Sequence, residues 1–372
     1  MSSLSTPVEE LLRRLAAVRS AMREQGIDTV LLSVGHDLPY LTGYTAMPLE
    51  RLTMLTVHTE GMPQLFVPRL EAPRVAEMPG LFDIVPWDET VEPLDLVAES
   101  CAGSSTIAIG DQTWARFVVG LTHRLPGVRW ERAVGVVGDL RMRKSDAEIL
   151  ALRAAAAAVD EIAAELQRGE ISLVGRTEAD VSADLSRRIL ARGHEKVNFA
   201  IVAAGENAAS PHHHPGNRVI KENEVVLCDF GGTMNGYCSD ITRCVVTGEI
   251  PHDVAAAYEV LMAAQSAGVA AGKTGVACEA VDEVTRQIIS DAGYGEYFVH
   301  RTGHGIGMEE HEDPYMVSGD SRLIEPGFAY SVEPGIYIPG KWGLRLEDIV
   351  VATDDGPVSL NRADHNLHSV CS

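Results

Sequence analysis

The chain has 372 residues, with 31 Lys and Arg against 53 Asp and Glu, so its formal net charge is −22 at pH 7. This length fits two domains. The content of 45% hydrophobic and 23% charged residues is typical of a globular protein rather than a disordered, collagen-like or coiled-coil one. The negative charge repels phosphate backbones and anionic membranes, which disfavours nucleic acid and membrane partners. Most of the excess carboxylates are expected on a solvated surface.

Cysteine usage and the first residues favour a cytoplasmic location. The six cysteines form no C-x-x-C pair and no dense framework, so we expect reduced thiols; they are Cys101, Cys228, Cys238, Cys244, Cys278 and Cys371. The first twenty residues include Glu9, Glu10, Arg13 and Arg14, where a signal peptide needs an apolar core. No later apolar run is expected to reach the roughly 18 residues of a membrane span.

The first part of the chain predicts an α/β domain. Leu11, Leu15, Val18 and Met22 recur at helical spacing, and Gly26 ends that pattern. Short β-rich segments follow, and they alternate with helical stretches; these segments are 29–33, 54–57, 64–67 and 106–109. We predict an α/β domain over residues 1–135, and we find no catalytic cluster in it.

Residues 136–372 predict a second domain of the α+β class with an internal duplication. Ser145 and Glu148 have the spacing of a capping box, and Thr177 introduces a second helix. Strands are expected at 198–203, 224–230 and 239–246. The same order then repeats, with helices at 254–270 and 279–292 and strands at 298–302, 329–333 and 345–351. Two such halves sharing one curved antiparallel sheet place a site between them.

Four carboxylates occupy equivalent places in the two halves. Asp229 in LCDFGG and Glu333 in SVEPG each end an apolar strand, and Asp240 and Glu347 lie on the next strand. Each of them alone is more often a turn or surface residue, but a buried carboxylate requires a partner, and the repetition favours metal binding. Two divalent cations would neutralise the four charges, and oxygen ligands with one imidazole suit Mn²⁺ or a similar ion.

Histidines supply the imidazole. His304 is the preferred ligand because Gly303 and Gly305 allow the backbone to approach a metal closely. In the run of three histidines from His212, we expect His213 and His214 to form a solvated turn.

These motifs resemble the pita-bread metallopeptidase family (M24), in its Xaa-Pro dipeptidase (prolidase) and aminopeptidase P branch. The matching stretches are HDLPYLTGY at 36–44, LCDFGG, SDITR, TGHGIG, SVEPGIY and RLEDIV. The resemblance implies a creatinase/prolidase-type N-terminal domain, a pita-bread catalytic domain and a homodimer. It also implies two bound divalent ions, Mn²⁺ first with Co²⁺ or Zn²⁺ as alternatives.

Carried over to this chain, the resemblance implies hydrolysis of the bond before proline. Its metal ligands would be Asp229, Asp240, His304, Glu333 and Glu347, with Asp240 and Glu347 bridging both ions. Its other site residues would be Glu333 as general base, His212 and His311 as donors to the developing oxyanion, Arg345 beside the last ligand, and His300 in the proline slot.

One departure leaves the substrate open. Family dipeptidases often have an arginine four residues after the second histidine, where it holds the substrate carboxylate, and here that residue is Tyr315. A tyrosine donates one hydrogen bond but no charge. A Xaa-Pro dipeptidase is therefore the leading interpretation, and an aminopeptidase acting on longer peptides or a small-amide hydrolase remains an alternative. A metal-free binding module is disfavoured, because every ligand position is filled.

Overall fold

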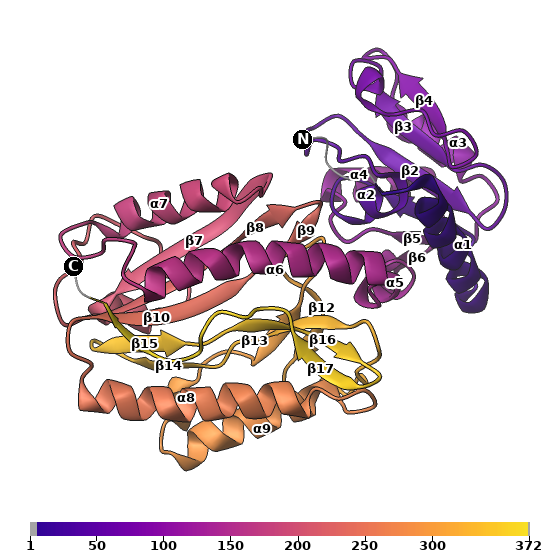
Figure 1. The fold of residues 1–372 in the computed structure, drawn as a ribbon. Coiled ribbons are helices and arrows are strands. Elements are labelled where there is room, and N and C mark those ends of the chain that lie inside the picture. Colours follow the sequence, from indigo (N-terminus) through magenta and orange to yellow (C-terminus); the bar gives the residue numbers. More distant parts are fainter. Residues whose placement is uncertain (1–5, 371–372) are drawn as a thin grey trace. The chain divides into compact units, whose positions relative to one another are not determined.

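The structure, a computed structural model, describes residues 6–370, so Cys371 lies outside the described residues. The chain divides into two compact units, Met1–Arg141 and Met142–Ser372 (Figure 1). The division falls within the short helix α5 (Gly138–Met142), a few residues after the expected boundary at 135.

The first unit is the expected α/β domain, built on one six-stranded sheet in the order β4-β3-β2-β1-β5-β6. Gly26 ends the first helix in the left-handed conformation, with φ of 66°, as its position in the pattern predicted. Sequence reasoning missed the two outer strands, which are short and only partly buried. The elements are α1 (Val8–Gln25), β1 (Thr29–Leu32), α2 (Asp37–Thr42), β2 (Met54–His58), β3 (Gln64–Pro68), β4 (Asp83–Trp87), α3 (Pro93–Ser100), β5 (Thr106–Ile109), α4 (Ala115–Arg124) and β6 (Arg129–Arg132).

The second unit contains the predicted repeat of two helices followed by strands. Its first half consists of α6 (Asp146–Gln167), α7 (Glu178–Ala191), β7 (Lys196–Ala204), β8 (Val225–Met234), β9 (Tyr237–Cys238) and β10 (Ile241–Thr247). Its second half consists of α8 (His252–Ala271), α9 (Cys278–Asp291), β11 (Gly303–Gly305), β12 (Glu312–Met316), β13 (Ala329–Val332), β14 (Gly335–Ile338), β15 (Trp342–Arg345) and β16 (Asp348–Thr353). The strands β17 (Gly356–Ser359) and β18 (His368–Val370) follow. Thr177 starts its helix with the expected capping box, and at Ser145 the Glu148 carboxylate accepts from the Ser145 amide at 2.8 Å.

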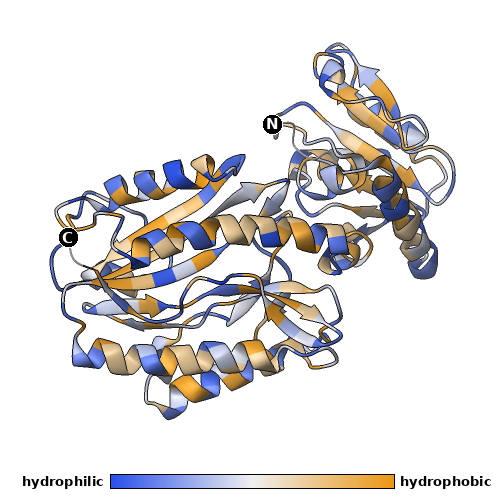
Figure 2. Cartoon of the chain, viewed as in Figure 1, coloured by the Kyte–Doolittle hydropathy of each residue, from blue (hydrophilic) through white to orange (hydrophobic). Residues whose placement is uncertain are grey.

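Two largely antiparallel sheets carry the two halves, where the sequence predicted one shared curved sheet. The first has the order β18-β10-β8-β7, and the second has the order β12-β11-β13-β16-β17. An isolated bridge between Thr242 and Glu347 joins them. In Figure 1 the helices α8 and α9 run beside the second sheet, and the striped colouring of the helices in Figure 2 reflects their amphipathic character.

Two expected strands of the second half were wrong. Residues 298–302 form no strand, because side chains of α9 satisfy their backbone: Arg286 donates to the carbonyls of Phe298 and His300, and Asp282 accepts from the Thr302 amide. The expected strand 345–351 is divided between β15 and β16, since Arg345 pairs with β14 while Glu347 bridges to β10.

The helix α8 also corrects the expectation about apolar runs. By length and composition alone it could cross a membrane. Its buried side chains, among them Val254, Ala257 and Leu261, instead pack in a core cluster with β14 and β15 residues such as Ile336 and Leu344. Packing in the core therefore accounts for its apolar composition.

Candidate metal centre

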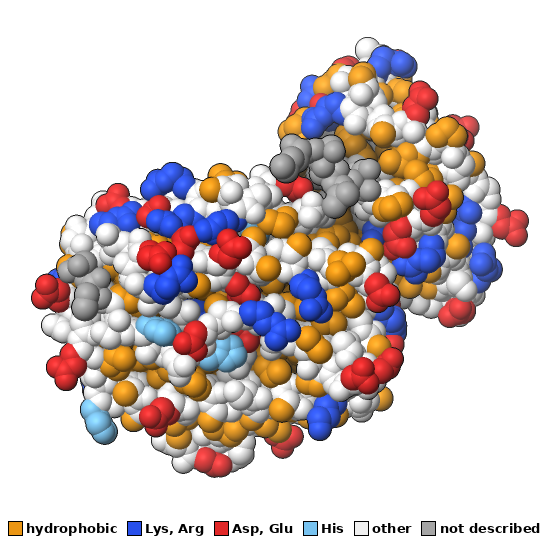
Figure 3. Space-filling view, viewed as in Figure 1, with side chains coloured by type: hydrophobic (Ala, Val, Ile, Leu, Met, Phe, Trp, Pro, Cys, Tyr) orange, Lys and Arg blue, Asp and Glu red, His pale blue; other side chains and the backbone are white. Residues whose placement is uncertain are grey.

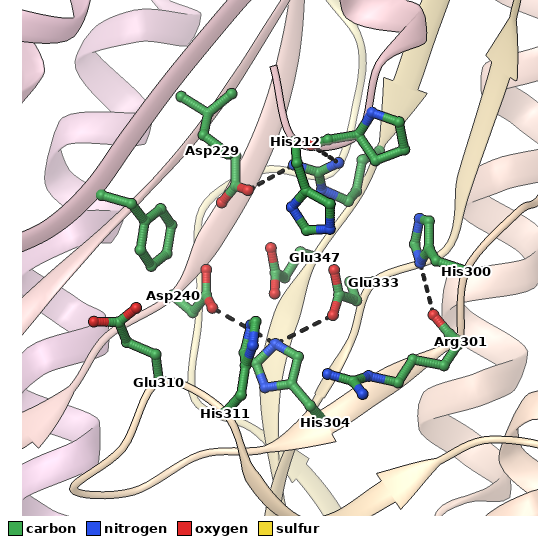
Figure 4. A pocket seen from close by; sticks show the side chains of 14 residues that line it. His212, Asp229, Asp240, His300, Arg301, His304, Glu310, His311, Glu333 and Glu347 are labelled. Carbon is green, nitrogen blue, oxygen red and sulfur yellow. Dashed lines mark hydrogen bonds and ion pairs between the residues drawn. The ribbon is translucent and has the colours of Figure 1, made fainter. Parts of the chain in front are cut away.

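A pocket of about 570 Å³ lies in the second unit, and both halves contribute to it (Figure 4). It contains every site residue expected from the sequence except Tyr315. The lining residues are Phe199, Ile201, Pro211, His212, Asp229, Asp240, His300, Arg301, His304, Glu310, His311, Glu333, Arg345 and Glu347.

The strands place the four carboxylates around the centre of this pocket. Asp229 lies within β8 opposite Thr242, and Asp240 comes directly before β10. Glu333 directly follows β13, and Glu347 directly precedes β16. Figure 4 shows these four side chains pointing toward one another. The equivalent positions seen in the sequence therefore converge in space.

Arg345 and Thr242 orient two of the carboxylates. Arg345 Nη2 donates to Asp229 Oδ2 at 2.6 Å, and its Nε donates to Thr242 Oγ1 at 3.1 Å. The Thr242 hydroxyl in turn donates to Glu347 Oε2 at 2.6 Å. Each of these carboxylates thus has one oxygen fixed by the protein, and the other is left for a ligand.

The ring of His304 is fixed in a similar way. Its Nδ1 lies 3.0 Å from the Gly305 carbonyl, to which it donates, so Nε2 is free to face Glu333 Oε1 at 3.2 Å and Asp240 Oδ2 at 3.9 Å. The flanking glycines are required by close backbone approach. A Cβ at Gly303 would lie 1.8 Å from the Ser331 carbonyl oxygen, and one at Gly305 would lie 2.3 Å from the Asp313 carbonyl oxygen.

The unpaired atoms fit bound cations. Asp229 Oδ1, Asp240 Oδ1 and Glu347 Oε1 are buried and have no hydrogen-bond partner among the described residues. Ligand atoms of Asp240, His304 and Glu347 all lie within 4.8 Å of one another. Buried oxygens of this kind are costly unless paired, and hard divalent cations prefer carboxylate oxygens. The donor set therefore fits a metal site.

Charge repulsion in the cluster points the same way. Burial raises the pKa of Asp240 and of Glu347 well above the usual carboxyl range, and the neighbouring carboxylates raise both further. Burial also disfavours the charged form of Glu333, but the hydrogen bond and charge of His304 lower its pKa to about 2. The cluster holds more negative charge than Arg345 alone can balance.

His300 is held at both ring nitrogens. Its Nδ1 lies 2.7 Å from the Arg301 carbonyl and donates to it, and its Nε2 accepts from the Tyr337 hydroxyl at 2.8 Å. That hydroxyl accepts from Arg345 Nη1 at 2.9 Å, so the ring is tied to the carboxylate cluster. Burial lowers the pKa of His300, which keeps the ring neutral. Only its carbon edge and face remain for a ligand.

His212 and His311 lie on the pocket wall, with His311 4.0 Å from His304 between ring centroids. The expectation of a solvated turn was wrong for His213. Its Nε2 lies 2.8 Å from Glu178 Oε2, and the fully buried Glu178 also accepts from the amide of Ala204. Sequence reasoning missed this pair because Glu178 lies 35 residues away.

Several lining residues were also missed, namely Phe199, Ile201, Arg301 and Glu310. Tyr315 does not line the pocket. It lies opposite His304 in the β11–β12 pairing, and its ring supports the Arg301 guanidinium at 4.2 Å. The position of Arg301 in the sequence, between the predicted site residues His300 and His304, could have indicated that it lines the pocket.

Comparisons with known proteins identify the family of the chain. Residues 150–354 match the model of metallopeptidase family M24, and residues 14–143 match the Creatinase/Prolidase N-terminal domain. Dipeptidase PepE from Mycobacterium ulcerans is 40% identical with a TM-score of 0.93, and the match covers 99% of this chain and 100% of that one. A prolidase from Thermococcus sibiricus is 33% identical with a TM-score of 0.91, covering 96% and 99%. A Xaa-Pro dipeptidase from Lactobacillus delbrueckii subsp. lactis is 35% identical, covering 92% of this chain and 95% of the relative. The chain is a hydrolase that belongs to metallopeptidase family M24.

Proposed function

We propose that this protein is a dinuclear-metal Xaa-Pro dipeptidase, which hydrolyses the bond before proline in dipeptides. The single observation that carries the proposal is the convergence of four carboxylates and His304, with three buried oxygens left unpaired among the described residues. Similarity to proteins named prolidase and Xaa-Pro dipeptidase supports the choice of substrate.

The five residues that would hold the metal ions are Asp229, Asp240, His304, Glu333 and Glu347. Bound divalent cations would activate both the substrate carbonyl and water for hydrolysis. Arg345 and Thr242 keep two of the ligands in place through the bonds described above. Mn²⁺ is the proposed ion, because the set is rich in oxygen donors, and Co²⁺ and Zn²⁺ are the alternatives.

The remaining roles belong to side chains around this cluster. Glu333 accepts a proton from the attacking water at its carboxylate, which Ser331 Oγ contacts at 3.1 Å. His212 and His311 donate hydrogen bonds to the oxygen that gains charge in the transition state. His300, whose nitrogens are both engaged, presents carbon atoms to the proline ring, and Phe199 and Ile201 form an apolar wall of the same pocket.

The direct test is hydrolysis of three substrates by Mn²⁺-loaded and chelator-stripped protein: a Xaa-Pro dipeptide, a Xaa-Pro tripeptide and a dipeptide without proline. We expect metal-dependent cleavage of the first alone. Rapid cleavage of the tripeptide would assign an aminopeptidase, which is the alternative that Tyr315 at the expected arginine position favours. No cleavage of any of them would favour a small-amide hydrolase.

We also propose a cytoplasmic homodimer. Five free, buried cysteines among the described residues suit a reducing compartment. The dimer rests on resemblance to the family and can be checked by light scattering. The interspersed acidic and basic side chains on the face in Figure 3 suit the solvated surface expected from composition, and no nucleic acid partner is proposed.

A further inference from the structure

The pocket contains a positively charged side chain, Arg301, to which the proposed chemistry gives no role. Two arginines line it, and Arg345 already donates to Asp229, Thr242, Tyr337 and the Pro211 carbonyl. Within the described part of the chain, the Arg301 guanidinium makes no ion pair or hydrogen bond, and its partner is the face of the Tyr315 ring. An arginine stacked on an aromatic ring keeps its edge of N–H donors free.

The backbone on both sides of Arg301 is fixed. Its carbonyl accepts from His300 Nδ1 at 2.7 Å. The next residue, Thr302, donates from its amide and its hydroxyl to the buried Asp282 at 2.9 and 2.7 Å. Below the guanidinium, Tyr315 is held in β12 by pairing with His304 of β11. The Arg301 guanidinium is therefore held by a fixed backbone and by the Tyr315 ring, which lowers the entropy cost of binding an anion.

The Arg301 guanidinium lies where one end of a short substrate would be expected. In Figure 4 the Arg301 side chain reaches from one side toward the carboxylate cluster, and Glu310 lies on the opposite side of the cluster. A dipeptide whose central bond lies at the cluster has a free carboxylate one residue beyond that bond. The planar guanidinium can bind such a carboxylate through two parallel hydrogen bonds.

We propose that Arg301, positioned by the ring of Tyr315, binds the terminal carboxylate of a dipeptide substrate. This inference rests on the proposed dipeptidase function and deepens it. Arg301 would be the residue that limits the substrate to two residues, because a third residue replaces the carboxylate with a neutral amide and leaves the guanidinium unpaired. Tyr315 would then act through the face of its ring, and its hydroxyl would not be required.

The first test compares Ala-Pro with Ala-prolinamide, which lacks the charged end. We expect the Mn²⁺-loaded wild type to prefer the acid in kcat/KM by on the order of 10- to 100-fold, the usual effect of a charge-assisted hydrogen bond. In Arg301→Gln this preference should fall to near unity, through a raised KM for the acid. Arg168→Gln is the matched control, because Arg168 is exposed and pairs with the exposed Glu170, and it should retain the wild-type preference. An unchanged preference in Arg301→Gln would overturn the proposal.

The second test separates the ring of Tyr315 from its hydroxyl. Tyr315→Phe keeps the aromatic face under Arg301 and should retain the preference for the acid, whereas Tyr315→Leu should lose most of it. Loss of the preference in Tyr315→Phe, with a correctly folded protein by circular dichroism, would mean that the hydroxyl rather than Arg301 holds the substrate.

Failure of the proposed function would be distinguishable from failure of this inference. If the wild type cleaves neither compound, the dipeptidase assignment fails. Calorimetric binding of intact Ala-Pro to the Mn²⁺-loaded protein would then still decide about Arg301. If the wild type binds Ala-Pro and Arg301→Gln does not, the result supports the carboxylate site. Equal binding by the wild type and Arg301→Gln, or no detectable binding by the wild type, refutes it.

Discussion

The two halves of the second unit share one plan but give different side chains to the pocket. The first half supplies Asp229 from within β8 and Asp240 directly before β10. The second half supplies Glu333 directly after β13 and Glu347 directly before β16. The flanking strand differs. In the first half, β7 pairs along its length with β8, placing Ile201 opposite Asp229. In the second half, β11 is only three residues long and carries His304.

This difference separates two roles of the duplication. The repeated part supplies four carboxylates, which we call the frame, and their negative charge suits two divalent cations; they are Asp229, Asp240, Glu333 and Glu347. The divergent strands supply what a metal frame alone lacks, namely an imidazole from one half and an apolar wall from the other. We infer that the frame determines the chemistry, and the flanking strands determine which substrate meets it.

Breaking the frame in either half should have the largest effect. Asp240→Ala removes a proposed ligand from the first half, and Glu347→Ala removes one from the second. We expect each to lower kcat/KM for a Xaa-Pro dipeptide by about a thousand-fold or more, because Lewis-acid assistance is worth several kcal/mol. Asp354→Ala, at an exposed carboxylate, is the control and should leave turnover unchanged. Full activity in either ligand variant would refute the symmetric frame.

The next effect concerns the connection between the halves. Arg243 of β10 donates to Asp348 of β16 at 2.8 Å, and both side chains are fully buried. Removing one partner leaves a buried charge uncompensated, so Asp348→Asn should lower the free energy of unfolding by about 3 kcal/mol. Chemical denaturation measures this loss. The exposed Arg168–Glu170 pair is the comparison, and breaking it should cost less than about 1 kcal/mol.

Removing the metal should make stability depend on pH. The raised pKa values of Asp240 and Glu347 mean that the folded, metal-free protein binds more protons than the unfolded chain above the usual carboxyl pKa. The contribution of these two carboxyls to the free energy of unfolding is therefore complete below the usual carboxyl pKa. It decreases as pH rises toward their folded-state pKa values. The decrease is on the order of 1 kcal/mol per pH unit for each carboxyl that is protonated in the folded protein but not in the unfolded chain. Calorimetry at pH 5 and pH 8 should show a lower melting temperature at pH 8 for the stripped protein. A melting temperature that rises between these pH values would contradict the charge repulsion.

The smallest expected effect tests whether the His213–Glu178 pair positions His212. Because His213 is bonded to the buried Glu178, His213→Ala should loosen the neighbouring His212 and lower kcat about tenfold, with bound metal unchanged. His214 is exposed and provides the matched control. Equal activities of the two variants would show that the pair with Glu178 has no part in positioning His212.

The sequence allowed the frame to be predicted because its evidence is local. Carboxylates within apolar strands, the glycines around His304 and the capping residues Ser145 and Thr177 each have a physical reason that can be found within a few residues. The family resemblance then indicated which of these residues act together.

The remaining features depend on contacts between distant segments. The segment 298–302 lost its expected strand to side chains of α9, and His213 gained a partner from α7. The stacking of Arg301 on Tyr315 depends on strand pairing that no local pattern indicates. These are the interactions through which tertiary structure overrides local preference.

The central claim is that both halves together hold two cations for hydrolysis. The most direct measurement is the metal content of the Mn²⁺-loaded protein after dialysis, with hydrolysis of a Xaa-Pro dipeptide followed on the same sample. We predict two ions per chain, with activity that is lost on chelation and restored by Mn²⁺. Full hydrolysis in a chain that retains no metal would contradict the account.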